Sequence, residues 1–186
     1  YVGVDPALGG KNCILAVEAT PDYRLIVRRI IEDVDFKTNS QIIDRLAHTV
    51  DYCSQEGAQV TDVVIEAMAF QKGLIHDENL LELRDYWGFN IRDHLTGWNK
   101  YDPDIGVPSM AESFRKREIV LPYAEDNYTR FEIDELCRQL YAWKPGVRGN
   151  RLRQDRVMAL WFCWIMWRER WKQPTGSIAN NEGWRR

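Results

Sequence analysis

The chain has 186 residues, which is long enough to bury a sizeable single core, and its 45% hydrophobic and 28% charged residues are ordinary for a soluble globular protein. Its four cysteines show no CxxC or Cys/His spacing, which argues against a zinc motif or a disulfide framework and favours a reducing compartment. No signal peptide opens the sequence, and the longest apolar run, residues 157–167, is shorter than the roughly 20 residues of a membrane span, so we expect a soluble cytosolic protein with no membrane partner.

The net charge of −3 is not that of a typical nucleic-acid-binding protein, but the charges are unevenly distributed. From Lys144 onward ten Lys or Arg residues stand against three Asp or Glu, whereas the first 143 residues carry 15 basic and 25 acidic residues. A basic end beside an acidic body can attract phosphates and leave carboxylates elsewhere free to bind cations. A solvated tail of mixed charge explains the same distribution equally well.

Three strands and a helix are predicted first along the chain. Residues 2–4, 12–18 and 24–34 are rich in β-branched and other apolar residues and are separated by turn-forming segments, a pattern typical of a β-meander. The helix that follows is predicted to have Asn39 or Ser40 as its N-cap.

The rest of the chain is predicted to alternate helices with short strands. Residues 63–65 are fully apolar, as expected of a central strand in parallel pairing. Further helices are predicted over residues 76–87, 109–117, 128–143 and 153–171, and short strands over residues 90–95 and 119–121. Residues 97–108 are polar and turn-rich, which indicates an irregular excursion, and the tail from Pro174 is expected to be flexible. This order predicts an α/β fold in which helices flank a mixed sheet.

The last predicted helix is apolar on every face between residues 157 and 167, and it carries Trp161, Trp164 and Trp167 three residues apart. Such a helix is either buried on all sides or covers a partner surface. We favour packing in the core, with docking to another domain or subunit as the alternative.

Three acidic residues stand next to segments that should be buried. Asp5 follows Tyr-Val-Gly-Val, Glu66 follows Val-Val-Ile, and Asp155 opens the helix that begins Arg-Val-Met-Ala-Leu. Carboxylates are rarely left inside a core unless something pairs with them. Each residue also has an ordinary alternative role: a turn former for Asp5, an ion-pair partner for Glu66 and a helix cap for Asp155.

The predicted order of elements allows these three acids to meet. If the first and fourth strands lie side by side, Asp5 and Glu66 leave the same edge of the sheet, and Asp155 approaches from the last helix. Ala159 lies one turn further along that helix and is small enough to let the helix sit close to the sheet. Three oxygen ligands suit Mg²⁺ or Mn²⁺ better than zinc, and such a cluster can hold two ions roughly 3.5–4 Å apart. We interpret Asp5 as the ligand that would bridge both ions.

Four stretches of the sequence occur in the order of a known family. They are Val2-Gly3-Val4-Asp5-Pro-Ala, Val64-Ile65-Glu66-Ala-Met-Ala-Phe-Gln, residues 114–122, and the segment from Glu135-Leu136 to Gln154-Asp155-Arg-Val-Met-Ala-Leu. In these stretches the sequence resembles the nuclease domain of bacteriophage large terminase subunits, the packaging motors that cut concatemeric viral DNA. The resemblance covers nearly the whole chain up to about residue 171.

The resemblance implies an RNase H-like fold with a mixed sheet of five strands or slightly more. It also implies two-metal endonuclease activity on double-stranded DNA, with Asp5, Glu66 and Asp155 as catalytic residues and ligands of Mg²⁺ or Mn²⁺. Gln154 is a departure, because the family often has a second acid there; Asp155 then serves alone, which would weaken one metal site. A metal-dependent nuclease is thus the predicted enzyme.

The same resemblance implies a domain organisation and partners. Residues 1–172 would form the nuclease domain and residues 173–186 a flexible tail, with an ATPase domain upstream in the intact protein. Expected partners are double-stranded DNA, that ATPase domain, the portal and the small terminase subunit, in the cytoplasm of the infected host cell. The protein is not expected to be secreted.

Six basic residues are predicted to contact the DNA backbone, which dominates non-specific binding. They are Lys100, Lys116, Arg117, Arg148, Arg151 and Arg153. For any single one, a solvated surface charge is the alternative.

Two other functions stay open: another RNase H-like nuclease of the junction-resolvase type, and a docking module for DNA or capsid that has lost catalysis. Gln154 and the mildly acidic net charge leave room for the latter.

Overall fold

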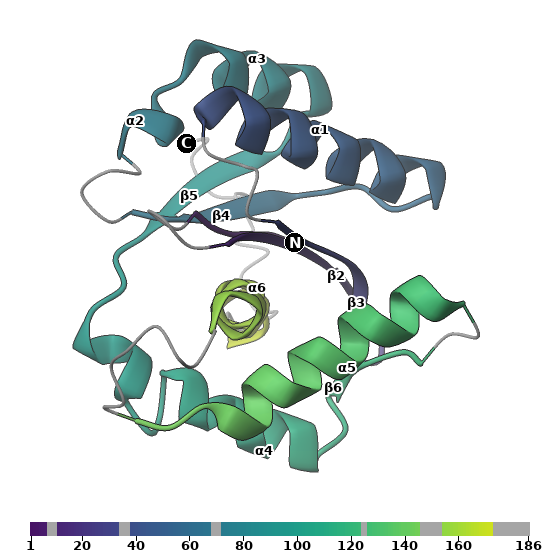
Figure 1. Ribbon diagram of the computed structural model, residues 1–186, viewed down its shortest axis with the longest axis vertical. Helices are drawn as coiled ribbons and strands as arrows, with labels where there is room; N and C mark the ends of the chain where they lie inside the picture. The colour runs from purple at the N-terminus through teal and green to yellow at the C-terminus, as the bar shows by residue number, and fades with distance from the viewer. Residues whose placement is uncertain (7–10, 34–37, 68–71, 124–125, 146–153, 173–186) are drawn as a thin grey trace, which may run out of the picture.

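A six-stranded mixed sheet forms the centre of the protein (Figure 1). The computed structural model describes residues 1–6, 11–33, 38–67, 72–123, 126–145 and 154–172. The strands are β1 (Val2–Asp5), β2 (Asn12–Ala19), β3 (Leu25–Asp33), β4 (Asp62–Glu66), β5 (Asn90–His94) and β6 (Ile119–Val120). They lie in the order β5-β4-β1-β2-β3-β6. The β1–β2 and β2–β3 pairs are antiparallel, and the β1–β4, β4–β5 and β3–β6 pairs are parallel. The predicted mixed α/β sheet is confirmed.

Helices cover both faces of this sheet. They are α1 (Asn39–Gln55), α2 (Lys72–Ile75), α3 (Glu78–Trp87), α4 (Met110–Arg115), α5 (Asn127–Ala142) and α6 (Asp155–Lys172), with two short 3₁₀ helices, η1 (Trp98–Tyr101) and η2 (Val107–Ser109). Figure 1 shows α1 and α3 on one face and α6 on the other, with α4 and α5 beyond α6. Because the sheet is covered on both sides, β4 is apolar throughout its interior, as the sequence predicted.

The position of α6 explains its uniformly apolar surface. This helix lies between the sheet and the outer helices, so Trp161, Trp164 and Trp167 are all buried (Figure 1). The indole nitrogens of Trp161 and Trp164 still find acceptors, the carbonyl oxygen of Ile105 and the hydroxyl of Ser113, each at 3.0 Å. The interpretation of these tryptophans as core residues is confirmed.

The contact between α6 and β1 is a backbone approach. Gly3 lies in the middle of β1, and a Cβ atom built on it would stand 2.1 Å from the carbonyl oxygen of Ala159. Only glycine in the strand and a small residue in the helix permit this distance. The prediction that Ala159 lets α6 sit close to the sheet is confirmed, and this close packing fixes the height of α6 above Asp5, two residues after Gly3.

Two local predictions were wrong. The N-cap of α1 is Thr38, because its hydroxyl accepts a hydrogen bond from the Gln41 N–H while the Gln41 side chain accepts one from the Thr38 N–H. The excursion after β5 is more regular than predicted, since it contains η1 and η2. The predicted flexible tail from residue 173 lies outside the described residues, as do residues 146–153 before α6.

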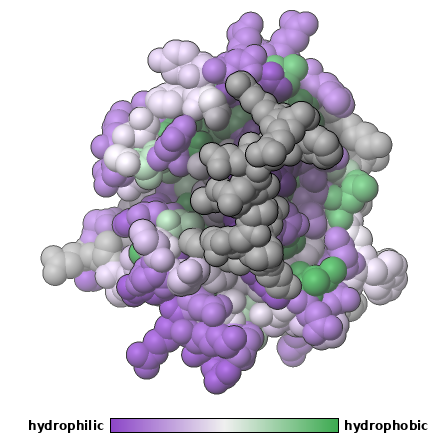
Figure 2. All heavy atoms as spheres, turned by 180° about the vertical axis from the view of Figure 1, so that it is seen from behind, coloured by the Kyte–Doolittle hydropathy of each residue, from purple (hydrophilic) through white to green (hydrophobic). Residues whose placement is uncertain are grey.

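No described helix is long and apolar enough to cross a membrane. On the face seen in Figure 2 hydrophilic residues predominate, and hydrophobic residues occur there as small separate patches.

Candidate active site

The predicted acids Asp5 and Glu66 end two neighbouring parallel strands. Val4 pairs with Ile65 in the β1–β4 register, so Asp5 and Glu66 come next on their strands at the same edge of the sheet. Gly3, two residues before Asp5, faces Ala159, and Val64, two residues before Glu66, packs in the same core cluster as α6. Because side chains alternate along a strand, both acids face α6.

Asp155 joins them from above as the first residue of α6. Asp5 is 7% exposed, and its pKa is raised well above the ordinary value, first by burial and then by the negative charges of Glu66 and Asp155. A hydrogen bond between the Asp5 and Glu66 carboxyl groups also raises the pKa of Asp5, whereas the charge of Lys100 lowers it. The structure thus brings the three predicted acids together and adds Lys100 beside them.

The chemistry of these groups fits a hard divalent cation. All three offer carboxylate oxygens, the donors that Mg²⁺ and Mn²⁺ prefer. Among the residues that the structure describes, no group of three or more His, Cys, Asp or Glu is arranged to hold a metal ion as it stands. Burial and the neighbouring negative charges that raise the pKa of Asp5 show that ionised carboxylates oppose one another here, which favours binding of a cation.

In metal-free buffer, the contribution of Asp5 to stability should fall as pH rises. Its pKa is raised above the ordinary value of 3.8, so the folded protein keeps the proton to a higher pH than the unfolded chain. The free energy of unfolding therefore decreases with pH between the unfolded and the folded pKa. Urea unfolding of the wild type and of Asp5→Asn in EDTA, from about pH 4 to about pH 8, measures this effect. The free energy of unfolding of the wild type should fall relative to that of the variant as pH rises. A difference independent of pH would contradict the expectation.

The sequence did not single out His94, which extends the row of polar side chains across the sheet. It pairs with Glu66 in the β4–β5 register, and its ring stands edge-on to Trp161 with centroids 5.0 Å apart. Burial lowers the pKa of His94, which favours the neutral imidazole. Its Nε2 lies 3.5 Å from the side-chain amide nitrogen of Asn99 in η1. Pairing of β4 with β5, which a single sequence does not reveal, is what places His94 beside Glu66.

The sequence also did not single out a buried ionic network on the other side of Asp5. Cys13 pairs with Asp5 in the β1–β2 register and with Glu32 in the β2–β3 register, so Glu32 lies in the same row, two strands from Asp5. The Glu32 carboxylate binds the guanidinium of Arg156, the residue that follows Asp155, and both side chains are almost fully buried. Burial foremost, and then the charges of Glu32 and Asp5, raise the pKa of the Cys13 thiol well above its usual range.

Solved structures with a similar fold include a viral terminase nuclease domain. The chain is similar to the human cytomegalovirus terminase nuclease domain, with a TM-score of 0.65 and 16% sequence identity over 91% of this chain and 81% of that chain. It has the terminase nuclease-domain fold. The manganese-soaked form of the same domain gives a TM-score of 0.63 and 14% identity over 90% of this chain and 81% of that chain. The predicted RNase H-like fold is confirmed. No protein-family model matches the sequence, and no curated protein matches it.

The basic residues that were predicted to contact DNA do not all lie near Asp5, Glu66 and Asp155. Lys100 in η1 is close enough to Asp5 to lower its pKa. Lys116 and Arg117 lie at the opposite end of the sheet, because β6 pairs with the beginning of β3, seven residues before Glu32. The structure therefore does not bring these two residues together with the acids. Arg148, Arg151 and Arg153 lie outside the described residues.

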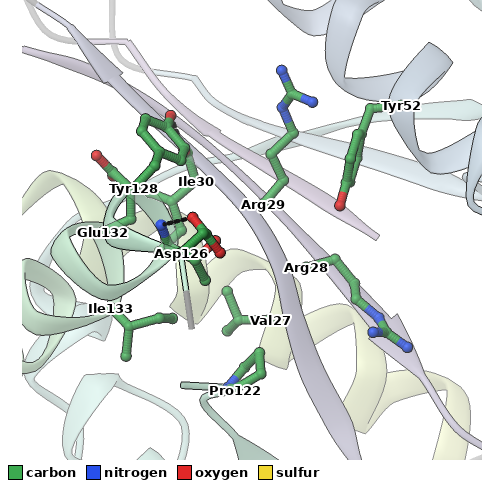
Figure 3. Close-up of a pocket in the computed structure, with 11 residues that line it drawn as sticks. Val27, Arg28, Arg29, Ile30, Tyr52, Pro122, Asp126, Tyr128, Glu132 and Ile133 are labelled. Atoms are coloured by element: carbon green, nitrogen blue, oxygen red, sulfur yellow. Dashed lines mark hydrogen bonds between the residues drawn. The ribbon is translucent and has the colours of Figure 1, made fainter. Parts of the chain in front are cut away.

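A separate pocket of about 300 Å³ opens between β3, α1 and the start of α5 (Figure 3). Arg28, Arg29 and Tyr52 line it on one side and Tyr128 and Glu132 on the other. Its charges are mostly engaged within the protein: Arg28 binds Glu18, and the Arg29 guanidinium lies 4.5 Å from the centre of the Tyr52 ring. The pocket is distinct from the acids, and Glu132 links it to the ionic network around Arg156.

Proposed function

We propose that this chain is a divalent-metal-dependent nuclease that cleaves double-stranded DNA, with Asp5, Glu66 and Asp155 holding the metal ions. The observation that carries the proposal is the burial of Asp5 between two further acids, at the edge where β1 and β4 end and α6 begins. Buried carboxylates close to one another destabilise a folded protein. Such groups occur preferentially at functional sites, where catalysis or cation binding requires them. The terminase nuclease-domain fold supports phosphodiester hydrolysis as that chemistry.

Each residue has a role in this proposal. Asp5 lies centrally and would bind both ions, with Glu66 on one side and Asp155 on the other. The N-terminus of α6 favours the ionised form of Asp155. Divalent ions, when bound, would activate the attacking water and stabilise the negative charge that develops on the phosphate. Lys100 beside Asp5 would hold a phosphate of the DNA backbone.

The chain would be the endonuclease module that cuts viral DNA concatemers during genome packaging, in the cytoplasm of the infected host cell. It would act with an ATPase domain of the same intact protein, the portal and the small terminase subunit. Arg148, Arg151 and Arg153 follow one another closely before α6 in the sequence and would add contacts to the DNA backbone.

Digestion of supercoiled plasmid tests the activity. The wild type should convert the plasmid to nicked and linear forms with Mn²⁺ or Mg²⁺ and not with EDTA. Glu66→Gln should lower the rate at least about 100-fold, because loss of a metal ligand exceeds the 10- to 100-fold effect of the residues that support ligands. The matched control is Asp62→Asn, which changes a buried carboxylate on the same strand, at the end away from the acids, and should keep its rate within about threefold of the wild type's once folding is corrected for.

The same assay separates the alternatives. DNA that is bound but never cut with either metal would contradict the nuclease proposal and indicate a docking module. A strong preference for a four-way junction over linear duplex would indicate a junction resolvase instead of a packaging nuclease. Equal rates for Glu66→Gln and the wild type would remove Glu66 from the site.

A further inference from the structure

Arg156 is a buried cation directly beside the candidate active site. It follows Asp155 in the chain, and its side chain is 2% exposed. The guanidinium of Arg156 is held by two acids, with Nη2 2.9 Å from Glu32 Oε2 and Nη1 2.8 Å from Glu132 Oε2. Besides these two ion pairs, the guanidinium donates two hydrogen bonds, from Nε to Glu32 Oε2 at 3.0 Å and from Nη1 to the Glu132 carbonyl oxygen at 2.7 Å. These contacts direct the positive charge toward β3 and α5.

The network also fixes the first turn of α6. The side-chain oxygen of Gln139 in α5 accepts a hydrogen bond from the Arg156 N–H at 3.0 Å, one of the N–H groups that a helix start leaves without a partner in its own helix. The Gln139 amide nitrogen in turn donates to Glu32 Oε1 at 3.0 Å. Strand β3 and helices α5 and α6 are therefore joined by a single connected set of polar side chains. Asp155 directly precedes Arg156 at the start of α6.

A guanidinium in this position has a competing set of acceptors. Asp5, Glu66 and Asp155 lie at the same edge of the sheet, and paired carboxylates are the preferred partners of arginine. An Arg156 side chain that turned toward them would neutralise the negative charge that attracts a divalent cation. Glu32 in β3 and Glu132 in α5 instead supply two carboxylates, which bind the guanidinium without the carboxylates of Asp5, Glu66 and Asp155.

We propose that Glu32 is a positioning residue, which with Glu132 holds the Arg156 guanidinium away from Asp5, Glu66 and Asp155 and so keeps these carboxylates available to divalent cations. The inference rests on the proposed function, since it assigns the regulation of charge at the same site. This role differs from general stabilisation of the fold. Loss of Glu32 should weaken cation binding because the freed Arg156 guanidinium competes for the carboxylates.

Mn²⁺ binding to the full chain, measured by titration calorimetry and by the electron paramagnetic resonance signal of free Mn²⁺, tests this without reference to cleavage. Glu32→Gln should weaken Mn²⁺ affinity at least about tenfold, the lower end of the effect expected when a group that supports metal ligands is removed. Asp62→Asn is the matched control. Asp62 is also a fully buried carboxylate bound to two arginines under α6, Arg92 at 3.1 Å and Arg170 at 2.7 Å, but at the opposite end of that helix. Its loss should leave Mn²⁺ affinity within about twofold of the wild type's.

A double variant separates this inference from a structural role. In Glu32→Gln/Arg156→Met no guanidinium is left to compete, and Glu132, whose pKa is already raised chiefly by burial, can take up a proton. Mn²⁺ affinity should therefore return to within about threefold of the wild type's, although Glu32 is still absent. A double variant that binds Mn²⁺ as weakly as Glu32→Gln, or more weakly, would overturn the inference.

Gln139→Leu provides a second variant in case Glu32→Gln does not fold. It removes the hydrogen bonds to Glu32 and to the Arg156 N–H, leaves every charge in place, and should weaken Mn²⁺ binding by about threefold to tenfold. Wild-type affinity in both Glu32→Gln and Gln139→Leu would overturn the inference while leaving the proposed function intact. A wild-type protein that binds no Mn²⁺ would overturn both.

Discussion

Asp5→Asn should abolish metal-dependent DNA cleavage and leave the metal-free protein at least as stable as the wild type. Loss of the central carboxylate should lower the plasmid cleavage rate at least about 100-fold, more than the loss of a group that merely supports ligands. In EDTA near neutral pH the free energy of unfolding should stay equal or rise, by up to about 2 kcal/mol, because a buried carboxyl group surrounded by like charges becomes a neutral amide. Plasmid digestion and urea unfolding measure the two effects on the same preparations.

Opposite changes in activity and stability distinguish a metal ligand from a structural residue. Saturating Mn²⁺ should stabilise the wild type, by about 2.7 kcal/mol at a hundred times the dissociation constant, because only the folded protein presents the site. Asp5→Asn should lose most of that stabilisation. If Mn²⁺ stabilised the variant as much as the wild type, Asp5 would not be a ligand. If Asp5→Asn were several kcal/mol less stable in EDTA, its carboxyl group would be structural.

The parts of the fold and site that could be predicted depend on local sequence patterns. The apolar run before Glu66 indicated a strand covered on both faces, and the apolar surface of α6 indicated a helix buried on all sides; both are confirmed. The closeness of Asp5, Glu66 and Asp155 followed from one assumption, that β1 and β4 are neighbours, which the parallel register bears out. Their role as metal ligands stays a prediction.

The parts that could not be predicted depend on contacts between distant segments. The ion pair between Glu32 and Arg156 joins residues 124 positions apart. Arg156 lies in the Asp155-Arg-Val-Met-Ala-Leu stretch, but nothing in the sequence indicates Glu32 as its partner. His94 reaches Glu66 only through the β4–β5 register. Lys116 was placed with the DNA contacts because it is basic, but a charge in the sequence does not reveal the end of the sheet at which it lies. There it pairs with Glu112 at 3.5 Å.

Gly3→Ala should be among the most destabilising single substitutions in the protein. The added Cβ would stand 2.1 Å from the carbonyl oxygen of Ala159 and 2.9 Å from its carbonyl carbon, and both are backbone atoms that cannot turn aside. To relieve the overlap, α6 must move away from β1, which opens the core around a helix whose central residues are almost all buried. We expect the free energy of unfolding to fall by about 3 kcal/mol or more, at the upper end of the range for overpacked cores. Urea or thermal unfolding measures this loss.

Gly73→Ala is the control for the general effect of replacing glycine. Gly73 lies in α2, and among the described residues its added Cβ would meet only the Asn39 side chain, at 4.0 Å. That substitution should be neutral or stabilising by up to about 1 kcal/mol, because alanine reduces the freedom of the unfolded chain. Equal stabilities of the two variants would show that α6 does not approach β1 as closely as the structure places it. Since Asp5 is two residues from Gly3 and Asp155 begins the displaced helix, Gly3→Ala should also weaken Mn²⁺ binding in the fraction that stays folded, which Gly73→Ala should not do.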